Sequence, residues 1–291
     1  MPAVASTLCA ILIWSTLTLF SAQLGHLPAF LSAGTALCLG GLVGLVRIRD
    51  WRVPWPTFAV GVAGIFGYHA LFFAALRHAP AVEVNVLQYL WPLLIVVQAP
   101  LHLPGNRLGP HHLLGALLGL AGAALVLSGG RLRLELDHLP GYLLALAAAL
   151  TWSNYSLLIK RVAPFPSGAV GGFCLASGLL SLGLFGLQCL ADPALAAVAI
   201  APRDWRFLLL LGMGPMGLAF YFWDAGMKRG DPRVVGALAY LTPLLSTLAL
   251  VLLGGRRLSW QAGVAMVLIV AGAAAGSLEL FRNLVRNRLS N

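Results

Sequence analysis

Ten apolar stretches, each about as long as a helix needs to cross a bilayer, occupy most of this 291-residue chain. In hydrocarbon every backbone N–H and C=O group needs a partner within the protein, and the helical patterning of these stretches excludes a barrel. We therefore predict an all-α integral membrane protein with ten transmembrane helices. They run approximately over residues 3–22, 27–46, 57–76, 82–101, 112–128, 141–160, 168–190, 206–227, 233–253 and 260–279.

The composition supports a membrane protein and excludes a large extramembrane domain. Hydrophobic residues make up 59% of the chain and charged residues 10%, and the mean hydropathy is +0.88. A net charge of +10 would suggest a nucleic-acid partner in a soluble protein. Here all 19 Lys and Arg residues lie in or beside the short connections, where they reach lipid headgroups. The expected partner is membrane lipid, with no nucleic acid.

The distribution of basic residues predicts the orientation in the membrane, because Lys and Arg accumulate on the cytoplasmic side. The richer side should be cytoplasmic, which places both termini inside. Its residues are Arg47, Arg49, Arg52, Arg107, Lys160, Arg161, Lys228, Arg229, Arg233, Arg282, Arg286 and Arg288. The other side has Arg77, Arg131, Arg133, Arg203, Arg206, Arg256 and Arg257.

An internal repeat divides the chain into two halves. Residues 89–94 (YLWPLL) recur as residues 240–245 (YLTPLL), a shift of 151, and the Trp-Ser pair at residues 14–15 recurs at residues 152–153. Each half contains five of the predicted helices. Because five is odd, the second half must enter the membrane from the opposite face, which gives an inverted repeat. We predict two five-helix domains, residues 1–130 and residues 131–291, around a central cavity, which is the architecture of a carrier.

These features resemble the EamA-type members of the drug/metabolite transporter superfamily over nearly the whole chain. The resemblance rests on the Trp-Ser pairs, the two Pro-Leu-Leu motifs and the ten short-looped helices. Within the superfamily, residues 68–70 (YHA) and 87–92 (LQYLWP) resemble most closely its bacterial aromatic amino acid exporters. The resemblance implies export from the cytoplasm across the bacterial inner membrane. It also implies a cavity lined largely by the third, fourth, eighth and ninth helices.

Two prolines inside predicted helices indicate where the cavity lies. A proline removes one helical hydrogen bond, so Pro92 should free the carbonyl of Gln88, and Pro243 that of Ala239. Such a carbonyl is tolerated at membrane depth where it lines a cavity or finds a protein partner. We place the pocket beside these kinks, and the alternative is that the prolines only shape packing. The predicted substrate-binding residues are Tyr68, His69, Asn85, Gln88, Tyr89, Trp91, Trp152, Tyr221 and Tyr240.

Aromatic residues within the spans are the second indication of a binding site. Trp14, Trp91, Trp152 and Trp223 lie away from the interfaces, where a buried indole N–H needs an acceptor. Together with nearby tyrosines they could enclose an apolar or aromatic side chain, or attract an ammonium group. The alternative is that these tryptophans belong to the packed core.

Three ionisable residues within the spans, His69, Glu83 and Asp224, are candidates for proton coupling because such groups are costly in a membrane. His69 could hydrogen-bond a substrate carboxylate or carry a proton. Glu83 lies near a helix start that favours a carboxylate, and Asp224 precedes Lys228 by four residues, so a structural role is the alternative for both.

No catalytic, nucleotide-binding or metal-binding motif is recognisable, so we expect neither an enzyme nor a cofactor or metal. The function predicted is an alternating-access carrier that exports neutral amino acids, with some preference for large apolar or aromatic ones. The alternatives are a carrier of another metabolite or drug, an intramembrane lipid-processing enzyme and a purely structural membrane subunit. A monomer is compatible with the sequence.

Overall fold

The fold, seen in a computed structural model that describes residues 2–105, 107–254, 260–276 and 278, is all-helical in that part of the chain. Seven helical segments there are long and apolar enough to cross a membrane, so this is a multi-pass membrane protein. They are Ala3–Leu24, Ala29–Trp51, Trp55–His78, Ala81–His102, Pro110–Ser128, Ser167–Ala191 and Pro202–Arg229.

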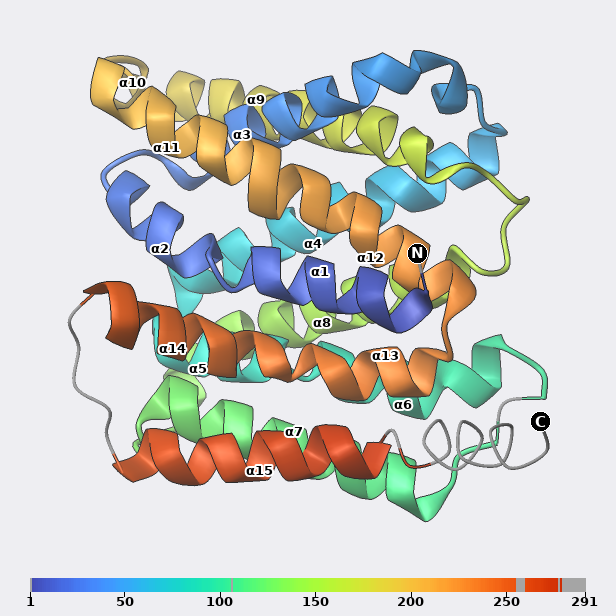
Figure 1. Ribbon diagram of the computed structural model, residues 1–291. Helices are drawn as coiled ribbons and strands as arrows, with labels where there is room; N and C mark the ends of the chain where they lie inside the picture. The colour runs from blue at the N-terminus through green and yellow to red at the C-terminus, as the bar shows by residue number, and fades with distance from the viewer. Residues whose placement is uncertain (1, 106, 255–259, 277, 279–291) are drawn as a thin grey trace.

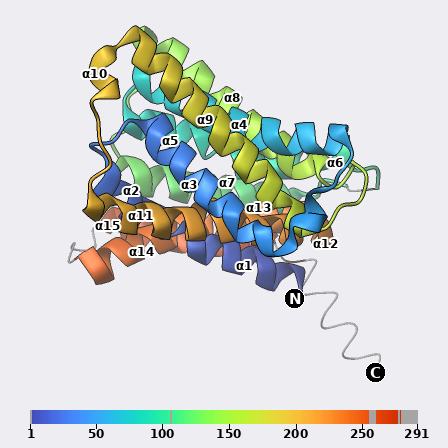
Figure 2. The same cartoon turned by 90° about the horizontal axis from the view of Figure 1, so that it is seen from above.

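The helices lie side by side in one bundle (Figures 1 and 2). The first part of the chain forms α1 (Ala3–Trp14), α2 (Leu17–Ser21), α3 (Ala29–Val43), α4 (Trp55–His78), α5 (Ala81–Gln88), α6 (Trp91–His102) and α7 (Pro110–Ser128). The second part forms α8 (Leu139–Leu158), α9 (Val170–Ala191), α10 (Pro193–Ala196), α11 (Pro202–Met213), α12 (Ala219–Arg229), α13 (Pro232–Ala239), α14 (Leu241–Gly254) and α15 (Trp260–Gly276).

Several predicted spans are interrupted helices, and the causes are local. The first span bends between α1 and α2, where the Ser15 and Thr16 hydroxyls donate to the carbonyls of Leu12 and Ile13 at 2.6 and 2.7 Å. The fourth span divides into α5 and α6, and the ninth into α13 and α14, shortly before Pro92 and Pro243 respectively. A π-helical turn, Gly214–Leu218, joins α11 to α12.

Close helix pairs hold the two parts of the chain together. α1 packs against α12, α3 against α9, α4 against α8, α6 against α13 and α7 against α15. Glycines allow the closest of these contacts, because a Cβ at Gly115 would lie 2.7 Å from the carbonyl oxygen of Gly272. A Cβ at Gly272 would lie 2.6 Å from the carbonyl oxygen of Gly115. These two glycines therefore serve backbone-to-backbone packing.

Candidate functional site

A cavity of about 560 Å³ lies between the helices, and both halves of the chain contribute to its wall. Its lining extends through residues 21–29 and 76–81, where α2 and α4 end and α3 and α5 begin. The cavity therefore reaches this end of the bundle. A volume of this size accommodates a small metabolite.

The inner end of the cavity is a cluster of aromatic rings around Trp14. The ring centroid of Trp14 lies 5.9 Å from that of Trp152, 6.4 Å from that of Trp91 and 5.2 Å from that of Trp223. The Trp14 indole N–H donates to the carbonyl of Pro215 in the π-helical turn at 3.0 Å. With its polar atom bonded and its ring packed against others, Trp14 is held in one orientation.

The polar side chains that line the cavity are neutral ones. The Tyr68 hydroxyl donates to Oε1 of Gln88 at 3.2 Å, and the Asn85 amide donates to the carbonyl of Ala81 at 2.7 Å. Among the described lining residues none is Asp, Glu, Lys or Arg. A cavity of aromatic and neutral polar groups suits a solute without net charge, since a net charge would have no counter-ion here.

Seven of the nine residues predicted to bind substrate line this cavity, and they come from α4, α5, the turn before α6, α6 and α8. They are Tyr68, His69, Asn85, Gln88, Tyr89, Trp91 and Trp152. Tyr221 and Tyr240 lie outside the lining. The Tyr240 hydroxyl accepts a hydrogen bond from the backbone N–H of Leu93 at 3.1 Å, and the Tyr221 hydroxyl donates to the carbonyl of Gly40 at 3.3 Å. Both tyrosines thus join helices of opposite halves.

The prolines and two of the three ionisable residues also lie outside the lining. Pro92 and Pro243 follow the two helix breaks and are not among the lining residues. Glu83 is buried in the first turn of α5. Asp224 is fully buried, accepts from Nζ of Lys228 at 2.7 Å and is also bonded by Ser167. These contacts are those of the structural ion pair that was the alternative for Asp224.

Thr242 was not among the residues predicted to bind, yet it lines the cavity at the start of α14. It is 7% exposed, and its buried hydroxyl has no hydrogen-bond partner among the described residues. Ser246, one turn later, also lines the cavity and donates to the Thr18 hydroxyl at 3.2 Å. The sequence did carry a signal, because the repeat places Thr242 at the position of Trp91.

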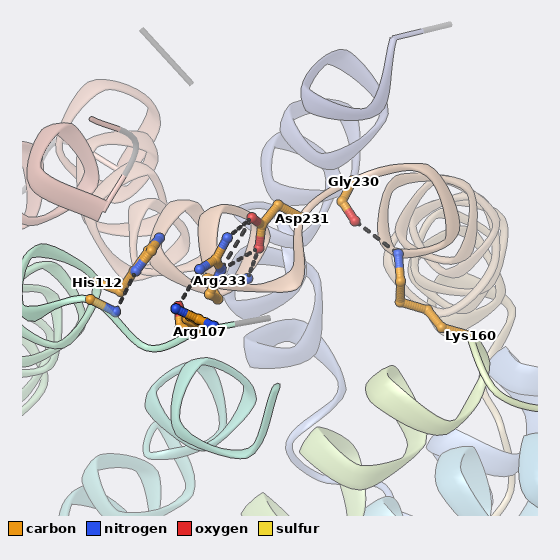
Figure 3. Close-up of polar contacts among 7 residues, drawn as sticks. Arg107, His112, Lys160, Gly230, Asp231 and Arg233 are labelled. Atoms are coloured by element: carbon orange, nitrogen blue, oxygen red, sulfur yellow. Dashed lines mark hydrogen bonds and ion pairs between the residues drawn. The ribbon is translucent and has the colours of Figure 1, made fainter. Parts of the chain in front are cut away.

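The end of the bundle away from the cavity lining is held together by hydrogen bonds from a buried arginine and a partly buried lysine (Figure 3). The guanidinium of Arg233 bonds the Asp231 carboxylate and the carbonyl of Arg107, which belongs to the other half. Nζ of Lys160 donates to the carbonyls of Met227, Lys228 and Gly230 at 2.7, 3.2 and 2.8 Å. This network ties the α6–α7 and α12–α13 connections to each other and to the chain after α8.

Two charged groups of this end, the Asp231 carboxyl and the Lys160 ammonium, have shifted pKa values. Burial alone would raise the pKa of the Asp231 carboxyl, but hydrogen bonds from Arg233 hold it below its ordinary value. Burial lowers the pKa of the Lys160 ammonium, which the charge of Asp231 partly offsets. The charges of Arg233 and Asp231 therefore help to keep the groups of this network ionised.

A multi-pass helical bundle with an uncharged aromatic cavity between its halves has the architecture of a small-molecule carrier. Comparison with known proteins supports this class. The model of the EamA-like transporter family matches residues 1–128 and 139–277, and this chain belongs to that family. The family predicted from the sequence is therefore confirmed, and the chain is a transporter and not an enzyme.

Individual relatives cover nearly the whole chain. A protein of Ancylobacter novellus named aromatic amino acid exporter YddG is 43% identical over 92% of this chain and 94% of its own length. The protein of the same name from Salmonella typhimurium is 28% identical over 91% of this chain and 93% of its own. A solved crystal structure with 42% identity aligns with a TM-score of 0.87 and covers 95% of this chain and 97% of that one.

Proposed function

We propose that this protein exports neutral amino acids from the cytoplasm, with a preference for aromatic or large apolar side chains. The observation that carries the proposal is the cavity itself, which combines an aromatic inner end with neutral polar groups and no charged lining residue among those described. An amino acid zwitterion has no net charge, and its side chain can pack against the rings. The names of the relatives from Ancylobacter novellus and Salmonella typhimurium support the same substrate class.

Transport is proposed to proceed by alternating access in two inverted five-helix domains, residues 1–130 and 131–291. In this scheme α8, the α13–α14 pair and α15 are the three further spans that, with the seven segments given above, make ten. The helix pairs support the inversion, because exchanging the halves converts the α1–α12 pair into the α8–α4 pair. The same exchange leaves the α3–α9 and α7–α15 pairs unchanged. The two segments matched by the family model also support a duplicated chain.

The conformation described here is proposed to face outward. The end held by Arg233 and Lys160 belongs to the side that is richer in basic residues, which would be cytoplasmic. The cavity reaches the opposite end. Opening toward the cytoplasm would then require these hydrogen bonds to break, and both termini would be cytoplasmic. The basic residues Arg256, Arg257, Arg282, Arg286 and Arg288, which entered the orientation count, lie outside the described residues.

Substrate contact is proposed for the seven predicted residues that line the cavity. The ring of Trp91 and that of Trp152, at 6.4 Å centroid separation, would pack on the substrate side chain. Asn85, Gln88 and Tyr89 lie near the break between α5 and α6 and supply polar groups to the cavity wall. Tyr221 and Tyr240 are proposed to act indirectly, by holding the helices that carry this wall.

The function is tested with the purified protein in liposomes loaded with amino acid, by following exchange with labelled amino acid outside. Phenylalanine and tryptophan should exchange well above the rate in protein-free liposomes, whereas lysine and glutamate should not. Exchange of no neutral amino acid would refute the proposal, and exchange of another metabolite would point to the alternative carrier. An imposed pH gradient in the same assay tests proton coupling, for which His69, Glu83 and Asp224 are the proposed groups.

The orientation is tested by cysteine labelling in a variant that lacks the four native cysteines. Arg49 and Arg131 are both exposed and fall on opposite sides of the predicted topology. In spheroplasts, a membrane-impermeant maleimide should label R131C directly and R49C only after the membrane is permeabilised. Labelling of both variants from the same side would overturn the inverted arrangement, because the three spans predicted between the two positions could then not all cross the membrane.

A further inference from the structure

His69 presents a hydrogen-bond acceptor to the cavity. Its Nδ1 lies 2.7 Å from the carbonyl oxygen of Ile65. A carbonyl oxygen can only accept, so Nδ1 carries the hydrogen of this bond. In a neutral imidazole the other nitrogen, Nε2, then has a lone pair and no hydrogen.

The imidazole is neutral because nothing in the lining would balance a positive charge. The described lining residues include no Asp or Glu, and Glu83 and Asp224 lie outside the lining. A cation without a counter-ion is strongly disfavoured at membrane depth. The bond to Ile65 therefore leaves His69 as an acceptor at Nε2. No hydrogen bond to Nε2 occurs among the described residues, and this atom is not sealed off from the cavity.

The surroundings of His69 suit a positive group and not a negative one. The imidazole centroid lies 5.0 Å from the ring of Tyr68, 6.0 Å from that of Phe73 and 6.3 Å from that of Phe220. All four side chains line the cavity. Aromatic rings attract a cation through their negative faces, and a nearby lone pair adds a directed hydrogen bond. A carboxylate would find no donor on the imidazole.

We propose that Nε2 of His69 accepts a hydrogen bond from the ammonium group of the transported amino acid. The substrate then binds with its amino end toward α4, and its carboxylate lies elsewhere in the cavity. This inference rests on the proposed amino acid export and adds the orientation of the substrate. It differs from both roles considered from the sequence, in which His69 could hydrogen-bond the substrate carboxylate or carry a proton.

Two substitutions separate the roles of the two ring nitrogens. His69→Asn keeps an amide N–H at the position of Nδ1, which preserves the bond to Ile65, but it has no group at the position of Nε2. His69→Gln can place its amide oxygen near the position of Nε2 and restore an acceptor. Both variants should keep the apparent melting temperature of the wild type within a few degrees, which separates loss of binding from loss of folding.

The assay measures phenylalanine exchange in liposomes and its inhibition by two analogues. Phenethylamine lacks the carboxylate, and 3-phenylpropionate lacks the ammonium group. In His69→Asn we expect the KM for phenylalanine to rise about tenfold, since a hydrogen bond to a charged group is lost. Inhibition by phenethylamine should weaken by a similar factor, and inhibition by 3-phenylpropionate should not change. His69→Gln should recover part of the loss.

Other outcomes overturn the inference. Weaker inhibition by 3-phenylpropionate with unchanged inhibition by phenethylamine would assign His69 to the carboxylate. Unchanged KM and unchanged inhibition by both analogues would show that Nε2 does not contact the substrate. If the wild-type protein exchanges no phenylalanine, the proposed function fails first, and that result is distinct from either of these.

Discussion

Trp152→Ala is expected to lower the ratio of transport rate to KM for phenylalanine by about tenfold or more. The ring centroid of Trp152 lies 5.4 Å from that of Tyr68, 5.5 Å from that of Phe220 and 5.9 Å from that of Trp14. Its removal takes away a wall of the cavity and loosens the rings beside it. Aromatic pairs contribute about 0.5–1.5 kcal/mol each beyond the area they bury, so the loss of two or three such contacts accounts for the factor.

The measurement is phenylalanine exchange in liposomes, compared with two other variants. Trp152→Phe retains a ring and should lose much less than Trp152→Ala. Trp55→Ala removes an indole that is 74% exposed and far from the cavity lining, and it should transport as the wild type does. Because truncating a buried tryptophan costs about 3–5 kcal/mol of stability, each variant is first shown to be folded by size-exclusion chromatography. Equal activity of Trp152→Ala and the wild type would contradict the assignment of the cavity.

Gly272→Leu is expected to lower the apparent melting temperature in detergent by about 10 °C or more. A Cβ at this position would lie 2.6 Å from the carbonyl oxygen of Gly115 and 2.8 Å from the backbone nitrogen of Gly119. A side chain can relieve such a clash by changing its rotamer, but the backbone of a helix cannot, so α7 and α15 would have to separate. Overpacking of this kind costs about 3 kcal/mol, and about 3 °C per kcal/mol is typical of chains approaching this length.

A matched control lies on the same helix. A Cβ at Gly263 of α15 would meet no atom of the described residues within 4 Å. Gly263→Leu should therefore leave the melting temperature within about 2 °C of the wild type, even though the change in composition is identical. A similar fall in both variants would mean that glycine in α15 matters for insertion or helix flexibility, and not for contact with α7.

Much of the architecture could be predicted because its causes are local. The third predicted span, residues 57–76, lies within α4 (Trp55–His78), since a long apolar stretch can satisfy its backbone in hydrocarbon only as a helix. The fourth and ninth spans divide shortly before Pro92 and Pro243, since proline disrupts helical hydrogen bonding wherever the fold places it. The family was also predictable, because the repeat and its motifs are properties of residue order.

The candidate site was less predictable, because equivalent residues in the two halves have different surroundings. Tyr89 and Tyr240 occupy the same position of the repeated motif, yet Tyr89 lines the cavity and Tyr240 bonds the backbone of Leu93. Thr242 and Trp91 are also equivalent, and both line the cavity, but only Trp91 was predicted from the sequence to bind substrate. Residue type therefore predicted candidate binding residues, but it did not predict which half of the chain contributes them to the cavity.

Residue order alone predicted the polytopic helical bundle and the family, which are confirmed, and the duplicated halves, which stay a prediction. Span length and helix breaks follow from backbone hydrogen bonding within each segment. The packed bundle was needed to show that Tyr240 faces a neighbouring helix and that His69 turns Nδ1 to Ile65 and leaves Nε2 for the cavity. The Tyr240 contact depends on which helices meet across the two halves, and the access of Nε2 to a cavity depends on where the packed helices leave space, so both exist only after the helices have packed.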